Sequence, residues 1–395
     1  MKRIATSLCA ATALVGLGAS ALADEPFRLG LLTSKSGTLA PVGVQVEQGV
    51  MLAIDEINAA GGLLGRQISV TLEDDESDPQ VAARKAERLY QQVGVDFITG
   101  TIHSGGTLAV GQIAEREGKL AATTVSYATS ITGESCRESM FRVNAHAGIQ
   151  AAALVTWLAQ NVEGDRYLIL APDYEMGRDA TSMFAQQIEA AGKTLVNTVL
   201  PPLGATDFST YFAAIRSAQP DVILTMTPGS DTVRLLTQLG EYGMAPGVYT
   251  IAGASGAVTA GNVGAIGEPA NGFLTAAGYS AEIDTPENRQ FVEAFRSRFN
   301  QDPDVFAVDS YSLVYLLKAA AEKAGALDTQ ALRDAIRGTT WSTPVGDKIM
   351  RAEDNQAAVD MFVIEVSIDG NSASFGVKDR VLAADIPIED KCTAF

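Results

Sequence analysis

Residues 27–62 read FRLGLLTSKSGTLAPVGVQVEQGVMLAIDEINAAGG, and this segment indicates the class of fold. The apolar run at 27–32 predicts a β-strand, and a loop rich in Ser, Gly and Thr follows it from Thr33 to Pro41. Residues 44–59 then repeat apolar side chains at helical spacing, and Gly61 and Gly62 are typical of a helix C-terminus. The stretch is therefore one strand–loop–helix unit.

The same alternation recurs along the chain. Further strands are expected near 68–72, 95–99, 119–124, 166–171, 194–200, 221–226, 248–252 and 272–276. Helices are expected near 79–92, 105–117, 147–161, 178–192, 208–217, 230–242, 286–299, 305–324 and 328–337. This rhythm indicates βαβ units and parallel sheets. About ten parallel strands are many for one sheet, so we expect an α/β protein of two lobes with a ligand cleft between them.

The C-terminal region has a different pattern. The apolar run MFVIEV at 361–366 is followed by Asp369-Gly370-Asn371, a sequence typical of a tight turn. We therefore expect a late hairpin at the edge of one sheet.

Composition excludes several classes of function. The chain has 395 residues, 47% of them hydrophobic, and its 29 Lys and Arg against 47 Asp and Glu give a net charge of −18. These values predict two or three globular domains with a packed core. The acidic balance argues against nucleic acid as a partner, because phosphate binding needs clustered cations. Two histidines and three cysteines leave little material for a zinc site, so we expect no metal and no cofactor.

The N-terminus has the pattern of a secretory signal peptide. Two basic residues follow Met1, residues 4–22 are mostly apolar, and a small-x-small site ends at Ala23. We expect residues 1–23 to be removed by cleavage after Ala23 and the mature chain to be soluble in the periplasm or outside the cell; the alternative is a single membrane anchor. Removal of Cys9 leaves Cys136 and Cys392, an even count typical of one disulfide in an exported chain.

Two loops of the first half are candidate ligand contacts. Ser104, Gly105 and Gly106 lie where a strand passes into a helix, so a hydroxyl and free N–H groups could hold an anion there. The alternative is that Ser104 is an ordinary N-cap. The next strand runs into Ser126 and Tyr127, which should lie beside the first loop. His103 and His146 are interpreted as structural residues rather than bases.

The second half offers similar loops at its strand ends. Tyr174 and Met176 follow one strand, Thr227 and Pro228 another, and Ser255 lies in a third loop; packing at a strand end is the alternative role. Residues 253–256 lack the spacing of a nucleotide-binding loop, and no nucleophile elbow or paired metal-spaced histidines occur. We therefore expect no enzyme activity.

These residues resemble a known family. LLTSKSGTLAPVGVQVEQGVMLAIDEINAAGGLLG at 31–65 and EDDESDPQVAARKAERL at 73–89 are similar to the first lobe of Leu/Ile/Val-binding-type periplasmic solute receptors of ABC importers. DYEMGRDATSMF at 173–184 and ATDFSTYFAAIRSAQPDVIL at 205–224 are similar to the second lobe. The resemblance covers nearly all of the mature chain.

The resemblance implies a type I binding-protein fold of two Rossmann-like lobes joined by a three-crossover hinge near 144–147, 275–280 and 342–348. Lobe one would comprise residues 24–145 plus 278–344, and lobe two 146–277 plus 345–395. It implies that a ligand contacts both lobes, through Ser104 and the turn after it, the 125–127 loop, the region around Tyr174 and Met176, and the 227–229 loop. We expect Cys136 to pair with Cys392 and hold the C-terminal tail near the hinge.

One departure from the family concerns the ligand. Amino-acid-binding members usually place an acid at Ala254-Ser255, where this chain has no carboxylate, and Asp231 and Asp309 are not at the matching place. A buried ammonium without a counter-charge would cost several kcal/mol. We therefore expect a monomeric receptor that closes on a small carboxylate-bearing solute, an aromatic or aliphatic acid or an amino acid, and delivers it to a membrane permease. The alternatives are a branched-chain amino acid receptor and a sensory protein feeding a signalling partner.

Overall fold

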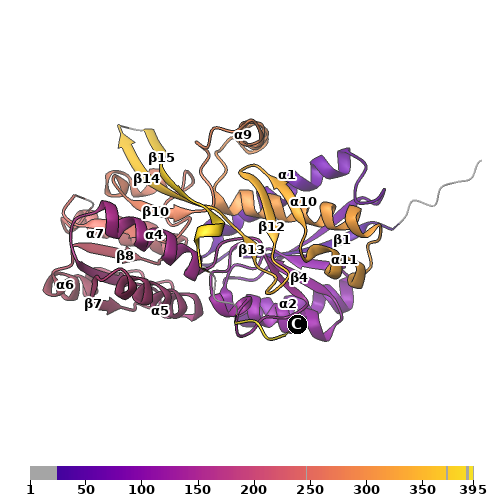
Figure 1. Cartoon of the computed structure of the whole chain (residues 1–395), viewed down its shortest axis with the longest axis horizontal. Helices are drawn as coiled ribbons and strands as arrows, with labels where there is room; N and C mark the ends of the chain where they lie inside the picture. The colour runs from indigo at the N-terminus through magenta and orange to yellow at the C-terminus, as the bar shows by residue number, and fades with distance from the viewer. Residues whose placement is uncertain (1–24, 246, 371, 388–390, 395) are drawn as a thin grey trace, which may run out of the picture.

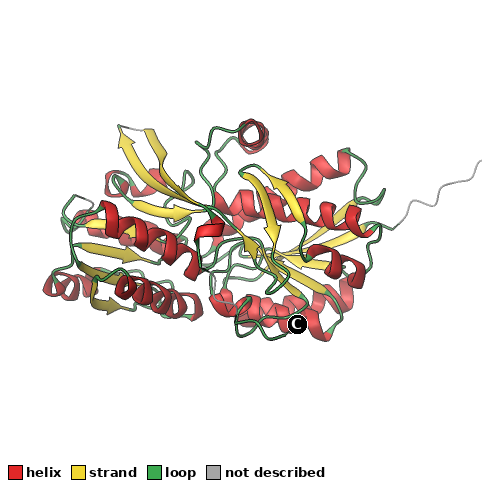
Figure 2. Ribbon diagram, viewed as in Figure 1, coloured by secondary structure: helices red, strands yellow, loops and turns green. Residues whose placement is uncertain are grey.

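The structure is a computed structural model that describes residues 25–245, 247–370, 372–387 and 391–394. The predicted signal peptide and Cys9 lie outside these residues. Two α/β lobes lie side by side, each with its own sheet (Figures 1 and 2). The predicted fold class is therefore confirmed. No helix in the described ranges is long and apolar enough to cross a bilayer.

The first lobe contains a five-stranded parallel sheet in the order β2-β1-β3-β4-β5. Its strands are β1 (Phe27–Thr33), β2 (Ile68–Asp74), β3 (Phe97–Thr99), β4 (Leu120–Thr123) and β5 (Met140–Arg142). Helices α1 (Ala40–Ala59) and α10 (Val305–Ala324) pack together on one side, and α2 (Pro79–Arg88) and α3 (Ser104–Arg116) on the other (Figure 1). A π-helical turn η1 (Leu89–Val93) extends α2, and η2 (Thr129–Ile131) precedes β5.

The second lobe contains a seven-stranded sheet in the order β15-β14-β10-β9-β8-β6-β7. Five strands are parallel: β6 (Arg166–Leu170), β7 (Thr194–Val199), β8 (Val222–Thr225), β9 (Thr250–Gly253) and β10 (Leu274–Ala277). Its helices are α4 (Ala147–Asn161), α5 (Glu175–Ala190), α6 (Ser209–Ala218), α7 (Ser230–Glu241), α8 (Val263–Ile266) and the turn η3 (Glu268–Ala270). The predicted hairpin is confirmed, because β14 (Met361–Asp369) and β15 (Ser372–Val381) pair antiparallel at one edge.

Three passages of chain connect the two sheets. β5 leads into α4, and β10 leads into α9 (Pro286–Phe299), α10 and α11 (Thr329–Ile336). A small antiparallel sheet of β11 (Thr340–Thr343), β12 (Gly346–Met350) and β13 (Ala357–Ala358) then precedes β14. Gln356, beside β13, forms a parallel bridge with Arg142 of β5. The turn η4 (Ala383–Asp385) follows β15. The lobe limits expected from the sequence remain a prediction.

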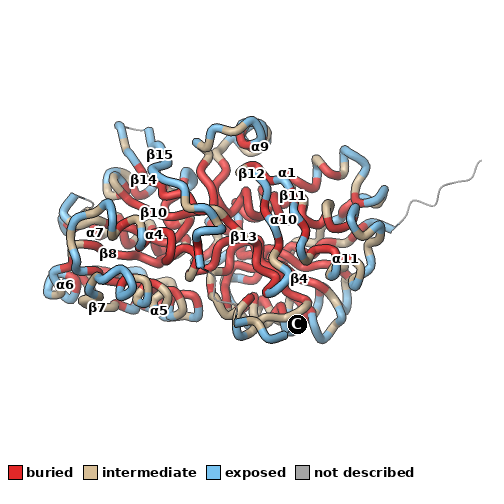
Figure 3. The backbone as a smooth tube through the Cα atoms, in the orientation of Figure 1, coloured by how far each residue is buried: buried red, intermediate tan, exposed pale blue. Residues whose placement is uncertain are grey.

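The core follows from the alternation of side chains along each strand. Phe27, Leu29 and Leu31 of β1 face the α1 and α10 side, whereas Leu32 of the same strand joins the cluster under α2 and α3. Because helices cover both faces of this sheet, β3, β4 and β5 are buried throughout and β1 almost so, as is usual in a parallel sheet (Figure 3). This arrangement leaves the loops at the carboxyl ends of the strands free to form a site.

Local differences from the sequence-based expectation have simple causes. β5 has only three residues, and β11 to β13 are short, so none presents enough of the period-two pattern to be expected from sequence. Helix α5 begins at Glu175, three residues before the predicted start at 178, with extended Tyr174 as the residue before it. The earlier start places Met176 in the first turn of the helix.

Candidate functional site

A small cavity lies between the two lobes. Its walls come from loops at the carboxyl ends of strands in both sheets and from the N-terminal turns of α1 and α10. The lining residues are Leu39, Val42, Ile102, Val125, Tyr127, Tyr174, Met176, Met226, Thr227, Pro228, Ala254, Ser255, Gly256, Ala257 and Phe306. The cavity is thus at the place where open α/β sheets bind ligands.

Six of the residues selected from sequence meet in this wall. They are Tyr127 from the first lobe and, from the second, Tyr174, Met176, Thr227, Pro228 and Ser255. Ser104, Gly105, Gly106 and Ser126 are not among the lining residues. That any of these residues contacts a ligand remains a prediction.

Polar contacts join the lobes around the cavity. The Tyr127 hydroxyl donates to the Ser255 carbonyl oxygen at 2.8 Å. The backbone N–H and the hydroxyl of Thr129 donate to the Asp179 carboxylate at 2.8 and 2.6 Å. The ring of His103 lies 4.8 Å from that of Tyr174, centroid to centroid, across the same gap. The structure therefore represents a closed arrangement of the lobes.

Most of the chain is similar to known binding proteins. The model of the periplasmic binding protein family matches residues 26–372. The chain belongs to this family. It is a binding protein of the Leu/Ile/Val-binding type, and the family is periplasmic.

Relatives of this binding protein differ in their named ligands. It is 26% identical to the leucine-, isoleucine-, valine-, threonine- and alanine-binding protein of Pseudomonas aeruginosa, over 86% of this chain and 90% of that one. It is 28% identical to a Leu/Ile/Val-binding protein of Rhizobium johnstonii, over 85% and 90% of the two chains. An ABC transporter solute-binding protein of R. palustris in complex with benzoate is 25% identical, with a TM-score of 0.83 over 93% of this chain and 99% of that one. All three are named as binding proteins, and the R. palustris protein is named as the solute-binding protein of an ABC transporter.

The alternative interpretation of Ser104 as the N-cap of α3 is wrong. His103, not Ser104, is the N-cap of α3, because its Nδ1 accepts the Gly105 N–H at 3.1 Å. Ser104 Oγ accepts the N–H of Ala128 at 3.3 Å, and Ser126 Oγ donates to the Ile102 carbonyl at 2.9 Å. These bonds hold the two loops together behind the cavity wall. Burial lowers the pKa of His103, which keeps the ring neutral and able to accept.

The interpretation of both histidines as structural is confirmed by their capping contacts. His146 Nδ1 accepts the N–H groups of Gly148 and Ile149 at 3.0 and 3.2 Å at the start of α4. Burial, followed by the positive charge of Arg142, lowers the pKa of His146 well below its usual value.

The cavity wall carries no Asp, Glu, Lys, Arg or His among its lining residues. The two acids considered as ammonium partners are engaged elsewhere. Asp309 forms a buried ion pair with Lys348 at 2.6 Å, and Asp231 pairs with Arg234 and accepts the Gly204 N–H at 2.8 Å. Burial raises the pKa of both carboxyls. The hydrogen-bonding groups in the wall are therefore neutral hydroxyls and backbone groups.

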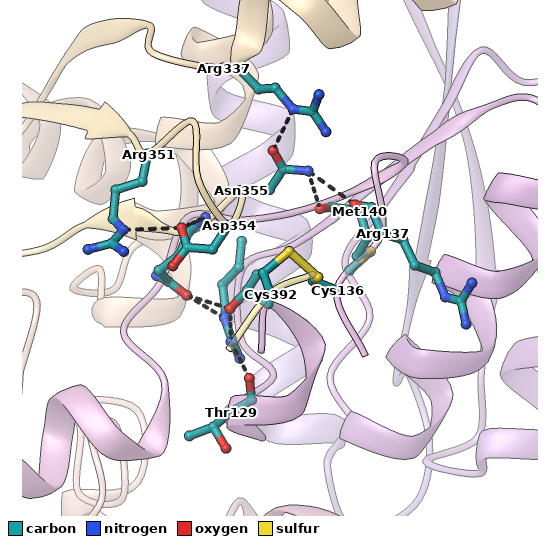
Figure 4. The surroundings of a disulfide bond; sticks show 12 residues. Thr129, Cys136, Arg137, Met140, Arg337, Arg351, Asp354, Asn355 and Cys392 are labelled. Carbon is teal, nitrogen blue, oxygen red and sulfur yellow. Dashed lines mark hydrogen bonds and ion pairs between the residues drawn. A yellow bond between two sulfur atoms is a disulfide. The ribbon is translucent and has the colours of Figure 1, made fainter. Parts of the chain in front are cut away.

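The predicted disulfide is present. Cys136, in the loop between η2 and β5, is bonded to Cys392 of the C-terminal tail. Beside it, the Asn355 carboxamide donates to the carbonyls of Arg137 and Met140, both at 3.1 Å, which holds this loop against the turn before β13 (Figure 4). The tail is thus tied to the first lobe next to the chain passage between the sheets.

Sequence reasoning missed the apolar part of the wall. Ile102 and Met226 follow strands β3 and β8 closely, so their position at a strand end was a usable signal; Val125 lies in the 125–127 loop that was expected to contact the ligand. No such sequence signal marked Phe306, because it comes from the start of α10 and reaches the site only through the packing of α10 on α1. Among the described residues, no group of three or more His, Cys, Asp or Glu is placed to hold a metal ion.

Proposed function

We propose that this protein is the receptor of an ABC importer and delivers a small carboxylate-bearing solute with an apolar or aromatic body to a membrane permease. The observation that carries this proposal is the uncharged cavity wall, with two tyrosines and Phe306 around it. An α-amino acid would bring its ammonium group into this wall, where its lining offers no carboxylate. A carboxylate can instead be held by neutral hydroxyl and N–H donors.

Closure of the lobes is the proposed mechanism. Ligand bound to one lobe shifts the population toward the closed form, because only that form contacts it from both sides. Ser104, Gly105, Gly106 and Ser126 would act by holding the first-lobe loops in place, and Tyr127, Tyr174, Met176, Thr227, Pro228 and Ser255 would contact the ligand directly. We propose a monomer with no chemical step and no cofactor, exported to the periplasm with cleavage after Ala23.

A branched-chain amino acid is the second candidate ligand, favoured by the names of the Pseudomonas and Rhizobium relatives. A thermal-shift screen of the purified mature protein separates the two, since a ligand that binds only the folded state raises the melting temperature. The panel holds aromatic carboxylates, short-chain acids, leucine and valine. Stabilisation by acids without a response to leucine or valine supports the proposal. Stabilisation by leucine and valine alone would replace it with the amino acid receptor.

A sensory role is tested separately. Purified protein loaded with the ligand found in the screen should support uptake of that ligand by vesicles that contain the cognate permease and ATPase. Absence of uptake, together with ligand-dependent activation of a membrane sensor, would assign the protein to signalling.

A further inference from the structure

Asp304 is a buried acid at the start of α10. Its Oδ1 accepts the N–H groups of Phe306 and Ala307 at 2.9 and 3.2 Å, so it is the N-cap of the helix. Thr259, in the loop after β9 of the other sheet, lines the same two hollows as Asp304. Asp304 is only 8% exposed. It therefore lies in the contact between the lobes.

Two further hollows adjoin the ligand cavity on this side. The first shares Val42, Gly256 and Phe306 with the cavity, and its wall also contains Asp304. The second shares Gly256, Thr259 and Asp304 with the first. Asp304 thus lies on the walls of both hollows, beyond Phe306 as seen from the cavity.

The carboxyl of Asp304 has no cationic partner among the described ion pairs, unlike Asp231 and Asp309. Burial, with a smaller effect from the charge of Asp309, raises the pKa of Asp304 to about 7. Near neutral pH a positive charge placed here would therefore stabilise the ionised carboxylate.

A second polar group in the same hollow lacks a partner. The Tyr279 hydroxyl is buried without a hydrogen bond in the described part of the chain, and Tyr279 lines the hollow with Asp304. The remaining charges on this wall are Glu282, Asp302 and Arg296, of which Arg296 pairs with Asp302. The hollow is therefore acidic overall and contains an unused hydrogen-bonding group, which suits a ligand nitrogen.

We propose that Asp304 is a specificity-determining residue that binds a cationic nitrogen at the end of the ligand opposite its carboxylate. The inference rests on the proposed function and narrows it to amine-bearing acids whose apolar body separates the two charges. An α-amino acid has both charged groups attached to one carbon. It therefore cannot place its carboxylate in the cavity and its ammonium at Asp304, beyond Phe306. Because Thr259 of the other lobe lines the same hollows as Asp304, binding of the nitrogen there would be coupled to closure.

The test compares matched ligand pairs by calorimetry on the full mature protein near neutral pH. The pairs are para-aminomethylbenzoate with para-ethylbenzoate, and ε-aminohexanoate with heptanoate, which differ by an ammonium in place of a methyl group. We expect the amine-bearing member of at least one pair to bind about tenfold more tightly, as a charged hydrogen bond provides. Asp304→Asn, which keeps an N-cap acceptor, should abolish this advantage and leave the affinity for the amine-free member unchanged.

Asp328→Asn is the matched control, because Asp328 caps α11 in the same way, accepting the Ala331 N–H at 3.0 Å, and does not line the cavity or the hollows. It should leave all four affinities unchanged. If the amine-free members bind as tightly as the amines, or if Asp304→Asn weakens both members equally, the inference is wrong while the proposed acid receptor stands. If none of the four compounds binds, the inference is wrong, and the proposed function is decided by the wider panel of the thermal-shift screen.

Discussion

The hydroxyl of Tyr127 donates a 2.8 Å hydrogen bond to the carbonyl oxygen of Ser255, and this bond joins the loop after β4 of one sheet to the loop after β9 of the other. Both residues line the cavity, and burial raises the pKa of Tyr127, so the hydroxyl remains a donor. The bond forms when the lobes are together. It therefore links the closed state directly to the wall of the site.

Removal of this bond should weaken ligand binding. Tyr127→Phe keeps the aromatic wall and loses the donor, which is worth about 1 kcal/mol, so the Kd of the ligand found in the screen should rise about fivefold. Calorimetry measures this change. Tyr167→Phe is the control, since the Tyr167 hydroxyl in β6 is buried and makes no hydrogen bond in the described structure. Equal weakening in the two variants would contradict the role of the Tyr127 bond.

Gly256 is a second point at which closure can be tested. Its φ is +72°, and an added Cβ would lie 2.3 Å from Cζ of Phe306, so Gly256→Ala should displace that ring and oppose closure. We expect at least about a tenfold rise in Kd in addition to about 1 kcal/mol of lost stability from the backbone conformation.

Gly325→Ala provides the comparison for Gly256→Ala. Gly325 has a φ of +64° with no atom within 4 Å of an added Cβ, so this variant should lose similar stability and retain full affinity. If Gly256→Ala binds the ligand with the Kd of the wild type, the Phe306 ring moves aside without affecting the site.

His146 should make stability depend on pH. The folded protein keeps His146 neutral because burial lowers its pKa, whereas the unfolded chain takes up a proton near pH 6.5, its ordinary pKa. The free energy of unfolding should therefore be insensitive to this group above about pH 6.5 and fall below it, by up to about 1.4 kcal/mol per pH unit.

Urea unfolding over a series of pH values measures this dependence. His146→Asn retains a capping acceptor without a titrating ring, so its stability should fall less steeply below about pH 6.5 than that of the wild type. Because His103 also has a lowered pKa, the difference between the two proteins, and not the wild-type slope alone, is the diagnostic quantity. Identical slopes would exclude His146 as the origin.

The Cys136–Cys392 bond closes a loop with a sequence separation of 256 residues. Its removal in Cys136→Ser/Cys392→Ser should reduce the free energy of unfolding by about 2–5 kcal/mol, because the unfolded chain gains freedom. Denaturant unfolding of the double variant measures this loss. Thiol titration of the wild-type protein from the periplasm should find no free thiol, and two free thiols there would show that the bond does not form in the cell.

The regular elements were predictable because their signals are local. The helices at 147–161, 286–299 and 305–324 were expected at the bounds the structure has, since apolar spacing and capping residues specify a helix within its own sequence. The hairpin at Asp369 followed from turn chemistry in the same way. Strand β5 and the small sheet of β11 to β13 were not expected, because strands this short depend on neighbours supplied by distant parts of the chain.

The candidate site was predictable in part. Six of the ten residues selected as ligand contacts line the cavity, because loops after parallel strands gather at one edge of a sheet. The role of Ser104 depended on which side chain caps the N-terminus of α3. His103 is the N-cap, because its Nδ1 accepts the Gly105 N–H at 3.1 Å. Asp231 and Asp309 are not at the family's ammonium position in the sequence, and the structure adds that they pair with Arg234 and Lys348.

The sequence by itself determined the two α/β lobes, the family and the expectation that Cys136 pairs with Cys392, because periodicity, local motifs and cysteine count do not depend on how the lobes meet. Which side chains form the cavity follows only from the tertiary structure. So does the position of Asp304 beyond Phe306, without a cationic partner among the described ion pairs. Both residues lie at the start of α10, which is far from the strand-end loops in sequence and reaches them by packing on α1. Burial and pairing are properties of that packing, and they decide which charges remain available to a ligand.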